Sequence, residues 1–323
     1  MKKVLILFSK SEWKKSKPPQ DEAYRYSYEY FYSLCKKNGI QMYRASYEWY
    51  DYKKNIFKHA WIFNNKGNDW QRVHNIRPDL IYDKTKARLE IFHKKELIGE
   101  NFPFINDLLF TQIIDNKFLN SLMFRQWSKA GWLIRNKNEL IKILKKITTD
   151  KVVIKPLRQS GGEGIQIFQK KRASQQVILN QTYLAQDFID SSHGIPRITK
   201  GLHDLRMIMV NDKLVYSLVR EPSKGSFLAN LAQGGIVRFI PSTNIPKSVS
   251  PIIRHANKLF SAFYPRIFSI DIMFDRKKRP WVVELNSMPG LYFPVGEKLY
   301  MVRMYNELST VFKKFFKDTR EII

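Results

Sequence analysis

The sequence contains almost no cysteine and no long apolar run. Cys35 is the only cysteine of the 323 residues, so neither an internal disulfide nor a cluster of thiolate metal ligands can form within the chain. A reducing compartment, the cytoplasm, is therefore expected. No stretch approaches the roughly 18 apolar residues that a membrane-spanning helix needs, so we expect no membrane span.

Several common functional motifs are missing as well. The six histidines are scattered along the chain, which argues against a histidine metal centre. There is no Walker phosphate loop, no dinucleotide-binding motif that opens a helix and no HExxH pair. We also find no Ser/His/Asp or Cys/His arrangement, so the chemistry is not expected to use a nucleophile of the protein.

Positive charge is what the sequence has in excess. Lys and Arg number 56 against 29 Asp and Glu, which leaves a formal net charge of +27. Such a charge attracts polyanions, namely a nucleotide, a nucleic acid, an acidic peptide or an anionic membrane surface. The cations are spread through segments such as "KNELIKILKK" and "DRKKRP". A lysine-rich composition and selection for an acidic partner are therefore two alternative explanations.

The pattern of elements predicts an α/β (α+β) chain with more than one lobe. Residues 1–106 alternate strand-like and helix-like segments, which is typical of a small βαβ lobe with a parallel sheet. Apolar spacing predicts one helix over Asn106–Phe124, and a second helix is predicted over Asn138–Lys146. From Lys151 the order is strand, Gly-rich loop, strand, helix and strand, followed by two hairpins and a last helix over 297–317.

Two strand-like segments near the end of the chain, "FSIDIMFD" and "PWVVELNS", carry acidic residues. If the four residues between them form a hairpin loop, Asp275 lies opposite Pro280 and Asp271 lies opposite Glu284. Opposed like charges destabilise a sheet, so a cation is expected between the two carboxylates. With the amide oxygen of Asn286 they make a set of oxygen ligands that suits Mg²⁺, with Mn²⁺ as a second candidate. The alternative is an exposed sheet face with solvated acids.

Cations and glycines that suit a triphosphate precede these strands. Lys155 ends the apolar strand "VVI", where an ammonium is costly to bury unless it is paired. Lys117 lies in the first predicted helix and would be unremarkable alone. The loop after Lys155 is rich in glycine, which lets backbone amides approach a phosphate closely, although such a loop is more often a simple hairpin tip. Its candidate phosphate-binding members are Ser160, Gly161, Gly162 and Gly164.

A further hairpin is predicted to turn near Asn211 and Asp212, within "DLRMIMVNDKLVYSLVRE". A two-residue turn would put Arg206 and Arg220 on opposite faces of the hairpin, whereas a three-residue turn over 211–213 with a bulge would put them on the same face. We predict the three-residue turn, because both arginines could then reach one anionic group.

The order of these motifs resembles the ATP-grasp superfamily, above all its glutathione-synthetase-like and RimK-like carboxylate–amine ligases. The likeness extends from about residue 107 to 295 and rests on "SGGEGI", "YLAQDFID", "HDLRMIMV", "NLAQGG" and "VVELNSMPGL". It implies an ATP-grasp fold in which an N-terminal lobe, residues 1–106, precedes two α+β subdomains that enclose the nucleotide. The central subdomain would comprise residues 107–185 and the C-terminal subdomain residues 186–323.

The resemblance also implies roles for single residues. Lys117 and Lys155 would hold the phosphates of ATP, and the loop at 160–164 would fold over them. Asp271, Glu284 and Asn286 would bind two Mg²⁺ ions, with Glu284 bridging. The residues expected to line the adenine are Gln186, Asp187, Phe188 and Ile189, with hydrogen bonds from Gln186 and from the backbone of Asp187 and Ile189. Those expected to position the carboxylate and the transferred phosphoryl group are Arg206, Arg220 and Asn230.

The implied activity is ATP-dependent formation of an amide or peptide-type bond through an acylphosphate. The substrates would be a carboxylate and an amine, and an acidic peptide or amino acid is a candidate substrate. A nucleotide-binding but non-catalytic, spore-coat-like relative is the alternative. Docking of a nucleic acid is a third hypothesis, which charge supports and no recognition motif does.

Three features depart from the family pattern, and one is the large positive charge, which points to an acidic acceptor such as a glutamate-rich peptide. The aromatic segments "YRYSYEYFY" and "SYEWYDY" are either core or a surface that docks a peptide. The segment "SSHGIPRITKGLHD" has no counterpart in the family pattern and could border the active site.

Overall fold

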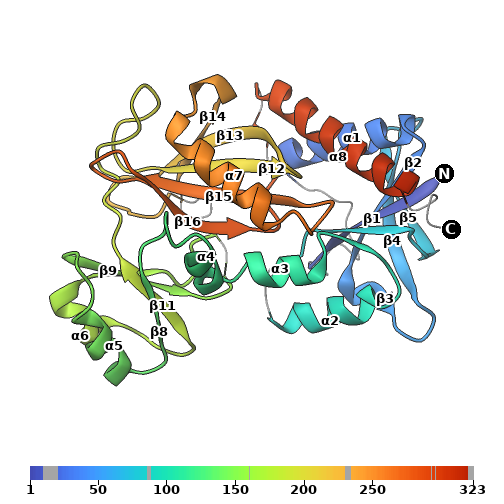
Figure 1. Cartoon of the computed structure of the whole chain (residues 1–323). Coiled ribbons are helices and arrows are strands. Elements are labelled where there is room, and N and C mark those ends of the chain that lie inside the picture. Colours follow the sequence, from blue (N-terminus) through green and yellow to red (C-terminus); the bar gives the residue numbers. More distant parts are fainter. Residues whose placement is uncertain are drawn as a thin grey trace. The chain divides into compact units, whose positions relative to one another are not determined.

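The structure is a computed structural model, and it describes residues 1–9, 21–85, 89–159, 161–229, 234–291, 293–294 and 296–318. The chain divides into two compact units, whose elements are drawn in Figure 1. The first unit comprises Met1–Phe110, Phe263–Ile267 and Met288–Ile323, and the second comprises Thr111–Ala262 and Phe268–Ser287. Helices and strands are mixed in both, which confirms the predicted α/β class. The division into three subdomains stays a prediction.

A mixed sheet forms the centre of the first unit. Its strands follow the order β3-β4-β2-β1-β6-β7, and β5 pairs with β4. Their bounds are β1 Lys2–Phe8, β2 Ile40–Ser46, β3 Tyr50–Asp51, β4 Ile56–Asn64, β5 Asp69–Ile76, β6 Leu80–Asp83 and β7 Phe104–Ile105. The predicted parallel pairing is confirmed for β1, β2, β6 and β7, whereas β3, β4 and β5 form an antiparallel part. Residues 4–7 of β1 are fully buried, as expected of a parallel strand that is covered on both faces.

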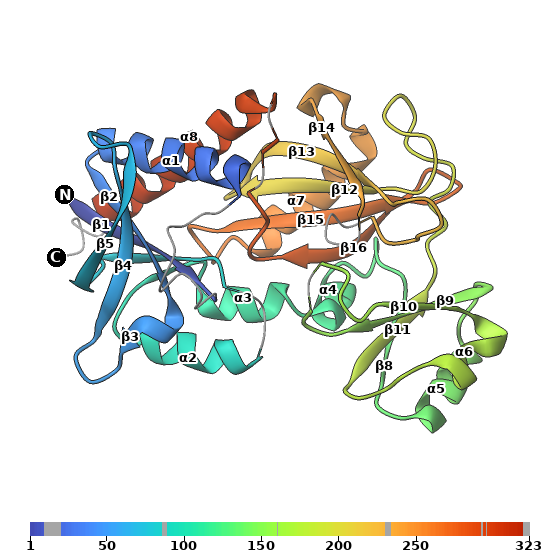
Figure 2. The same cartoon turned by 180° about the vertical axis from the view of Figure 1, so that it is seen from behind.

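Helices cover both faces of this sheet (Figures 1 and 2). Helix α1, Glu22–Lys37, and helix α8, Lys298–Asp318, lie side by side on one face, and α2, Leu89–Gly99, lies on the other. The ring of Phe31 in α1 stacks on that of Tyr305 in α8, with centroids 4.4 Å apart. Most aromatic residues of the two N-terminal segments are buried, which favours core packing over a docking surface. These are Tyr28, Phe31, Tyr32, Tyr47, Trp49 and Tyr50.

The predicted single helix over Asn106–Phe124 is wrong, because the structure breaks it into two. Helix α3 spans Leu108–Ile114 and helix α4 spans Lys117–Met123. Asn116 begins α4 as its N-cap, since its side-chain oxygen accepts hydrogen bonds from the backbone N–H groups of Phe118 and Leu119. Apolar spacing continues through the break, so periodicity alone did not reveal it.

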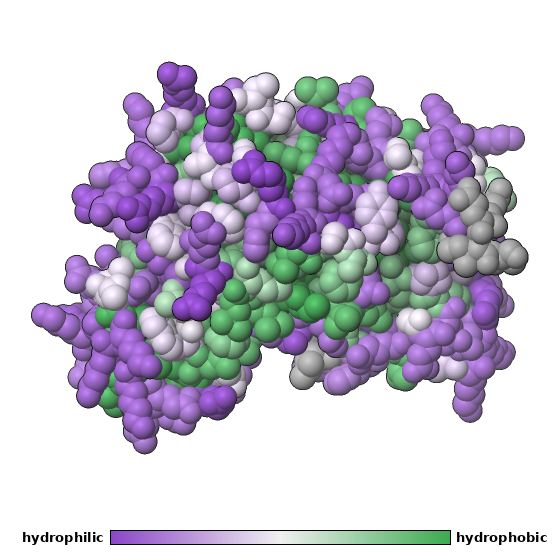
Figure 3. Space-filling model, in the orientation of Figure 1, coloured by the Kyte–Doolittle hydropathy of each residue, from purple (hydrophilic) through white to green (hydrophobic). Residues whose placement is uncertain are grey.

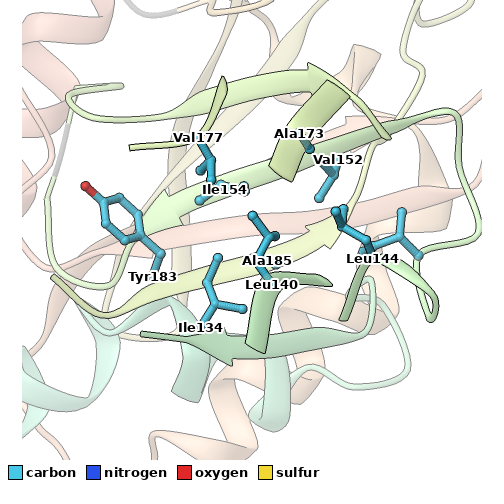
Figure 4. Packing of buried hydrophobic residues seen from close by; sticks show 10 residues of the cluster. Ile134, Leu140, Leu144, Val152, Ile154, Ala173, Val177, Tyr183 and Ala185 are labelled. Carbon is cyan, nitrogen blue, oxygen red and sulfur yellow. The ribbon is translucent and has the colours of Figure 1, made fainter. Parts of the chain in front are cut away.

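The first sheet of the second unit has the order β10-β9-β11-β8. Its strands are β8 Gly131–Ile134, β9 Lys151–Pro156, β10 Gln166–Gln169 and β11 Tyr183–Asp187. Helices α5, Lys137–Leu144, and α6, Ala173–Gln176, pack on one face of this sheet, and α5 confirms the second predicted helix (Figure 4). The buried cluster between helices and strands consists of Ile134, Leu140, Leu144, Ile147, Val152, Ile154, Ala173, Val177, Tyr183 and Ala185.

The second sheet of this unit has the order β14-β13-β12-β15-β16. Its strands are β12 Asp204–Val210, β13 Lys213–Glu221, β14 Ile236–Ile240, β15 Ile267–Phe274 and β16 Pro280–Asn286. Helix α7, Ser250–Leu259, follows β14 in the chain and was not predicted. Across the described ranges, no helix has both the length and the apolar character that crossing a membrane requires.

Candidate active site

The two acidic strands pair as β15 and β16, and both carboxylates are inside the protein. Asp271 lies directly opposite Glu284, as predicted. The side chain of Asp271 is fully buried and Glu284 is 8% exposed, which excludes a solvated sheet face. The pairing next to the turn differs from the prediction, because Pro280 pairs with Phe274 and not with Asp275. A register shift next to Asp271 compensates for this difference of one residue.

Arginines supply the positive charge at Asp271. Nε of Arg206 donates to Oδ1 of Asp271 at 2.8 Å, and Nη2 of Arg206 donates to Oδ2 at 2.5 Å. Nη2 of Arg220 donates to the same Oδ2 at 2.8 Å. Burial on its own would raise the pKa of Asp271, but the two guanidinium groups outweigh it and hold the pKa below its usual value. Asp271 therefore has cationic partners from the protein itself, and the metal ion expected between the two carboxylates stays a prediction.

Arg206 and Arg220 lie on the same face of their hairpin, as predicted, but the device that puts them there is different. The predicted three-residue turn is wrong, since Val210 pairs with Lys213 around a two-residue turn. A register shift between Ile208 and Met209 supplies the extra residue within β13. The bulge therefore lies inside the hairpin rather than at its tip.

Asp204 is a member of this group that the sequence reasoning missed. It lies opposite Arg220, and its Oδ2 accepts from Nη2 of Arg220 at 2.6 Å. Its Oδ1 is buried and has no hydrogen-bond partner within the described ranges. Burial raises the pKa of Asp204 to about 6, although the charge of Arg220 lowers it. The signal was available, because Asp204 stands two residues before Arg206 and strand alternation puts both on one face.

A pocket opens beside these strands. Its wall combines residues of both sheets of the second unit with the segment before β12. The residues that line it include Lys129, Lys155, Ile165, Gln186, Asp187, Phe188, Ile189, Ser191, Leu202, Asp204, Phe227, Met273, Val282 and Glu284. Ser191 and Leu202 belong to "SSHGIPRITKGLHD", so that segment borders the pocket.

Lys155 is the buried cation of this pocket. Its side chain reaches the wall from β9 and the residue is 6% exposed. Burial lowers the pKa of Lys155 to about 8, and the charge of Lys117 adds to this effect while Glu284 opposes it. In the described part of the chain its ammonium has neither a hydrogen bond nor an ion pair. By contrast, Lys117 contacts Oε2 of Glu284 at 3.3 Å and donates to the carbonyl oxygen of Gln159.

The four residues predicted to border adenine all line the pocket, at the end of β11. Several of their groups are already engaged. Nε2 of Gln186 donates to the carbonyl oxygen of Lys129 at 3.0 Å, and Oδ1 of Asp187 accepts from the backbone N–H of Thr148 at 2.7 Å. The backbone N–H of Phe188 donates to Oγ1 of Thr149 at 3.0 Å. These contacts fix the direction in which the chain leaves β11.

The predicted phosphate loop joins β9 to β10, between two strands as expected. Gly161, Gly162 and Gly164 have φ angles of 71°, 79° and 71°, a backbone conformation that side chains disfavour. These glycines are not among the lining residues of the pocket, whereas Ile165 just after them is. Ser160 and Asn230, which were also predicted to belong to the site, lie outside the described residues.

The donor atoms near Asn286 suit a hard divalent cation. Its Nδ2 lies 3.5 Å from Oδ2 of Asp271 and 3.4 Å from Oε1 of Glu284, so the three side chains converge. The two ends of an amide group are interchangeable by a flip, which would turn the oxygen toward the carboxylates. Oδ1 of Asp271 and the oxygens of Glu284 keep acceptor capacity, whereas Oδ2 of Asp271 already accepts from both arginines. The oxygen ligands are therefore of the kind that Mg²⁺ or Mn²⁺ prefers, and water and phosphate oxygens would complete the set.

Asp115 forms a long-range contact that the sequence did not indicate. Its Oδ1 accepts from the backbone N–H of Ser287 at 2.8 Å, and its Oδ2 accepts from the hydroxyl of Ser287 at 2.7 Å. Ser287 directly follows Asn286, and Asp115 stands two residues before Lys117. The carboxylate thus ties the start of α4 to the end of β16.

Comparison with known proteins bears on this geometry. Residues 126–298, more than half of the chain, match the family model of the RimK-like ATP-grasp domain. The chain belongs to the RimK-like ATP-grasp family. A probable alpha-L-glutamate ligase of Nitrosococcus oceani is 27% identical to this RimK-like chain over 246 residues, 73% of the chain and 76% of that protein. In other curated matches with the same name, the matched stretch covers less than half of the protein.

Solved structures of ligases share the fold of this RimK-like protein. D-alanyl-alanine synthetase A of Vibrio cholerae matches with a TM-score of 0.65 at 12% identity, over 97% of this chain and 98% of that chain. An RiPP-associated ATP-grasp ligase of Chryseobacterium gregarium, in complex with ADP and a leader and core peptide, matches with a TM-score of 0.57 at 12% identity, over 99% and 97%. The predicted ATP-grasp fold and ligase class are confirmed, and the non-catalytic alternative is not favoured.

Proposed function

We propose that this ligase uses the pocket of the second unit to bind ATP, activates a carboxylate as an acylphosphate and joins it to an amine. Lys155 carries the proposal. Its ammonium is buried in the pocket wall that also holds Gln186 and Glu284, and it makes no direct ion pair or hydrogen bond in the described part of the chain. A buried cation without a partner is costly, and an anionic ligand would supply the missing charge.

The nucleotide in this proposal extends from the end of β11 to Lys155. Lys155 and Lys117 hold the phosphates, helped by the glycine loop that contains Gly161, Gly162 and Gly164 and by Ser160. Gln186 and the backbone of Asp187 and Ile189 face the adenine. The backbone N–H of Phe188 already donates to Thr149, so Phe188 contributes its ring and not its amide.

Asp271, Glu284 and Asn286 would hold Mg²⁺, or Mn²⁺, next to the phosphates. When bound, such an ion offsets the negative charge that spreads over the phosphoryl oxygens. Arg206 and Arg220 already meet at Oδ2 of Asp271, so their remaining N–H groups can position an anionic substrate at the same place. We assign to them, and to Asn230, the carboxylate and the transferred phosphoryl group.

The reaction consists of two substitutions. A carboxylate oxygen of the substrate attacks the γ-phosphorus of ATP, the bond to the β-phosphate oxygen breaks, and ADP leaves. The amine then attacks the carbonyl carbon of the acylphosphate, inorganic phosphate leaves, and the nitrogen loses a proton to water. Alignment of the reacting groups and offset charge provide the acceleration, and no side chain has to form a covalent bond.

An acidic peptide or amino acid is the substrate class that we favour. The curated relatives are named alpha-L-glutamate ligases, and one structural neighbour is a ligase in complex with peptides. The net charge of +27 attracts acidic molecules at long range. The alternative, a protein that binds nucleotide without ligation, would bind ADP equally well but would release none from ATP.

Release of ADP and phosphate from ATP tests the proposal. The purified protein is supplied with Mg²⁺ and either single amino acids, glutamate-rich peptides or both. We expect ADP release that requires Mg²⁺ and a carboxylate–amine pair, with a new amide product visible by mass spectrometry. Nucleotide binding without product under all of these conditions would contradict the proposal and favour the non-catalytic alternative.

A further inference from the structure

The loop between β15 and β16 presents an unusual run of positive charge. Its residues Arg276, Lys277, Lys278 and Arg279 are consecutive, and all four are exposed. Neighbouring like charges repel one another, so a run of this kind gives nothing to the stability of the hairpin. Oδ1 of Asp275 accepts from the backbone N–H groups of Lys277 and Arg279, at 2.9 and 3.0 Å, which fixes the shape of the loop.

A second segment, residues 190–203, lies against this loop. Nζ of Lys278 donates to the carbonyl oxygens of His193 and Gly194, the latter at 3.2 Å. Nε of Arg276 contacts Nε2 of His193 at 3.3 Å. The segment adds two exposed cations of its own, Arg197 and Lys200. We call the exposed cations of both segments the basic rim. Its members are Arg197, Lys200, Arg276, Lys277, Lys278 and Arg279.

Hydrogen bonds hold residues 190–203 against the neighbouring strands. His203 donates from Nδ1 to the carbonyl oxygen of Gly201 at 2.9 Å, and its Nε2 accepts from the backbone N–H of Phe274 in β15 at 3.2 Å. Nη2 of Arg238 donates to the carbonyl oxygen of Ile198 at 2.7 Å. The basic rim is therefore preorganised, which lowers the entropic cost of binding a partner.

The carboxylates near the basic rim, Asp275 and Asp190, already accept hydrogen bonds from other groups. Asp275 accepts from two backbone N–H groups and from Nε1 of Trp281 at 2.9 Å. Asp190 accepts from the backbone N–H of Ser192 at 3.1 Å and lies 3.9 Å from Arg276. In contrast, the side chains of Lys200, Lys277 and Arg279 make no hydrogen bond or ion pair within the described ranges. These three cations are available to a partner.

The basic rim adjoins the proposed nucleotide pocket. Ser191 and Leu202 of the segment line the pocket, and so do Met273 and Val282, which flank the loop on β15 and β16. Figure 3 shows hydrophilic side chains around the place where Figure 1 draws the tip of β15 and β16. A partner bound there would lie next to the mouth of the pocket.

We propose that the basic rim docks an acidic segment of a polypeptide, and its assignment to a peptide substrate rests on the proposed ligase function. A nucleic acid fits the surface less well, because binding of single strands relies on aromatic rings that stack with bases. The aromatic side chain beside the loop, Trp281, is half-buried, its N–H is bonded to Asp275, and its ring carries Nζ of Lys129 at 3.7 Å from the centroid.

Reversal of the three available charges tests the proposal. The variant K200E/K277E/R279E leaves Lys278 and the backbone contacts of the loop unchanged. The control K142E/K146E/K171E reverses three exposed lysines of the same unit that lie away from the basic rim, so the net charge changes equally. The probe is a fluorescent peptide of about ten glutamates, which spans roughly 33 Å when extended. Binding is measured by anisotropy without ATP turnover.

We expect the basic-rim variant to bind the peptide at least about tenfold more weakly than the wild type, and the control to change by less than about threefold. Equal losses in both variants would overturn the proposal, because net charge alone would then explain binding. Tighter binding of an RNA of similar length, lost in the same variant, would also overturn it in favour of a nucleic acid. Thermal stabilisation by ADP reports separately on the nucleotide pocket, so failure of the docking proposal is distinguishable from failure of the ligase proposal.

Discussion

The carboxylate of Asp115 accepts two hydrogen bonds from Ser287, 172 positions later in the chain. Both residues are buried. This contact connects the segment that begins with Lys117 to the strand end that carries Glu284 and Asn286, and Lys117 in turn lies 3.3 Å from Glu284. The bonds of this carboxylate therefore help to set the position of the proposed phosphate-binding lysine relative to the proposed metal ligands.

Removal of this carboxylate should loosen the metal site. For Asp115→Ala we expect a loss of about 1–3 kcal/mol in unfolding free energy, because two buried donors lose an acceptor. The Mg²⁺ concentration that half-saturates ADP binding should rise about tenfold, as for other groups that orient metal ligands. Asp115→Asn keeps an acceptor oxygen and should restore most of the Mg²⁺ dependence. A purely structural role would lower stability in Asp115→Ala and leave the Mg²⁺ midpoint unchanged.

Lys155 should determine nucleotide affinity and its pH dependence. Lys155→Ala removes a charged donor and should weaken ADP binding about 10–100-fold, whereas the exposed Lys142→Ala should not. The pKa of Lys155 is about 8 without ligand, so its ammonium is charged below that pH and neutral above it. Wild-type affinity should therefore fall as the pH rises above 8, and this fall should be absent in Lys155→Ala. Isothermal titration at several pH values measures both effects, and a wild-type dissociation constant in Lys155→Ala would remove its phosphate role.

Glu284 should be required for turnover with Mg²⁺. For Glu284→Ala we expect a loss of at least about a hundredfold in ADP release, since the proposed ion would lose one of its carboxylate ligands. Glu284→Gln keeps the size of the side chain and serves as the matched variant, and circular dichroism checks that both variants fold. Unchanged turnover in a folded Glu284→Ala would contradict the metal assignment.

Acid should weaken the attachment of residues 190–203. Burial lowers the pKa of His203, helped by the charge of Lys278, while contacts with Gly201 and Ser191 and the charge of Glu221 oppose this effect. The folded protein therefore binds fewer protons than the unfolded chain, so the stability that His203 contributes is present above its unfolded pKa, about 6.5, and is lost as the pH falls further. Protonation would also replace the acceptor at Nε2 by a donor that faces the N–H of Phe274.

The comparison of wild type with His203→Gln isolates this effect, because both proteins contain Asp204, whose pKa burial raises to about 6. We expect the wild type to lose up to about 2 kcal/mol more than the variant between pH 7 and pH 5. Melting temperatures measured across this range check the prediction. Parallel pH profiles would show that His203 does not titrate in this window.

The sequence predicted which side chains share a face better than the exact register that brings them together. Alternation along a strand was enough to bring Asp271 and Glu284 together, because each lies close to a turn and register errors have little room to grow. In both hairpins the predicted turn length was wrong by one residue. A bulge within the strands compensated for this error, so the expected side chains still lie on the same face. A bulge depends on packing around the strand, which local periodicity does not contain.

The contacts that the sequence did not predict are long-range ones. Asp204 was overlooked because its role depends on a pair formed with Arg220 across a hairpin whose register was uncertain. The bond between Asp115 and Ser287 joins segments that no local pattern relates. The break between α3 and α4 was missed because apolar spacing continues across it, although Asn116 is a good N-cap.

The contact between Lys117 and Glu284 has a consequence for the order in which ligands bind. Each of these side chains neutralises the other while the pocket holds no ligand. If a triphosphate alone bound to Lys117, the carboxylate of Glu284 would lose its partner. If a divalent ion alone bound to Glu284, the ammonium of Lys117 would lose its partner. When the triphosphate and the divalent ion bind together, the pair of Lys117 and Glu284 is replaced by two pairs, Lys117 with a phosphate and Glu284 with the ion, and no charge is left uncompensated. Under the proposed roles, the protein therefore selects the metal–nucleotide complex over either component.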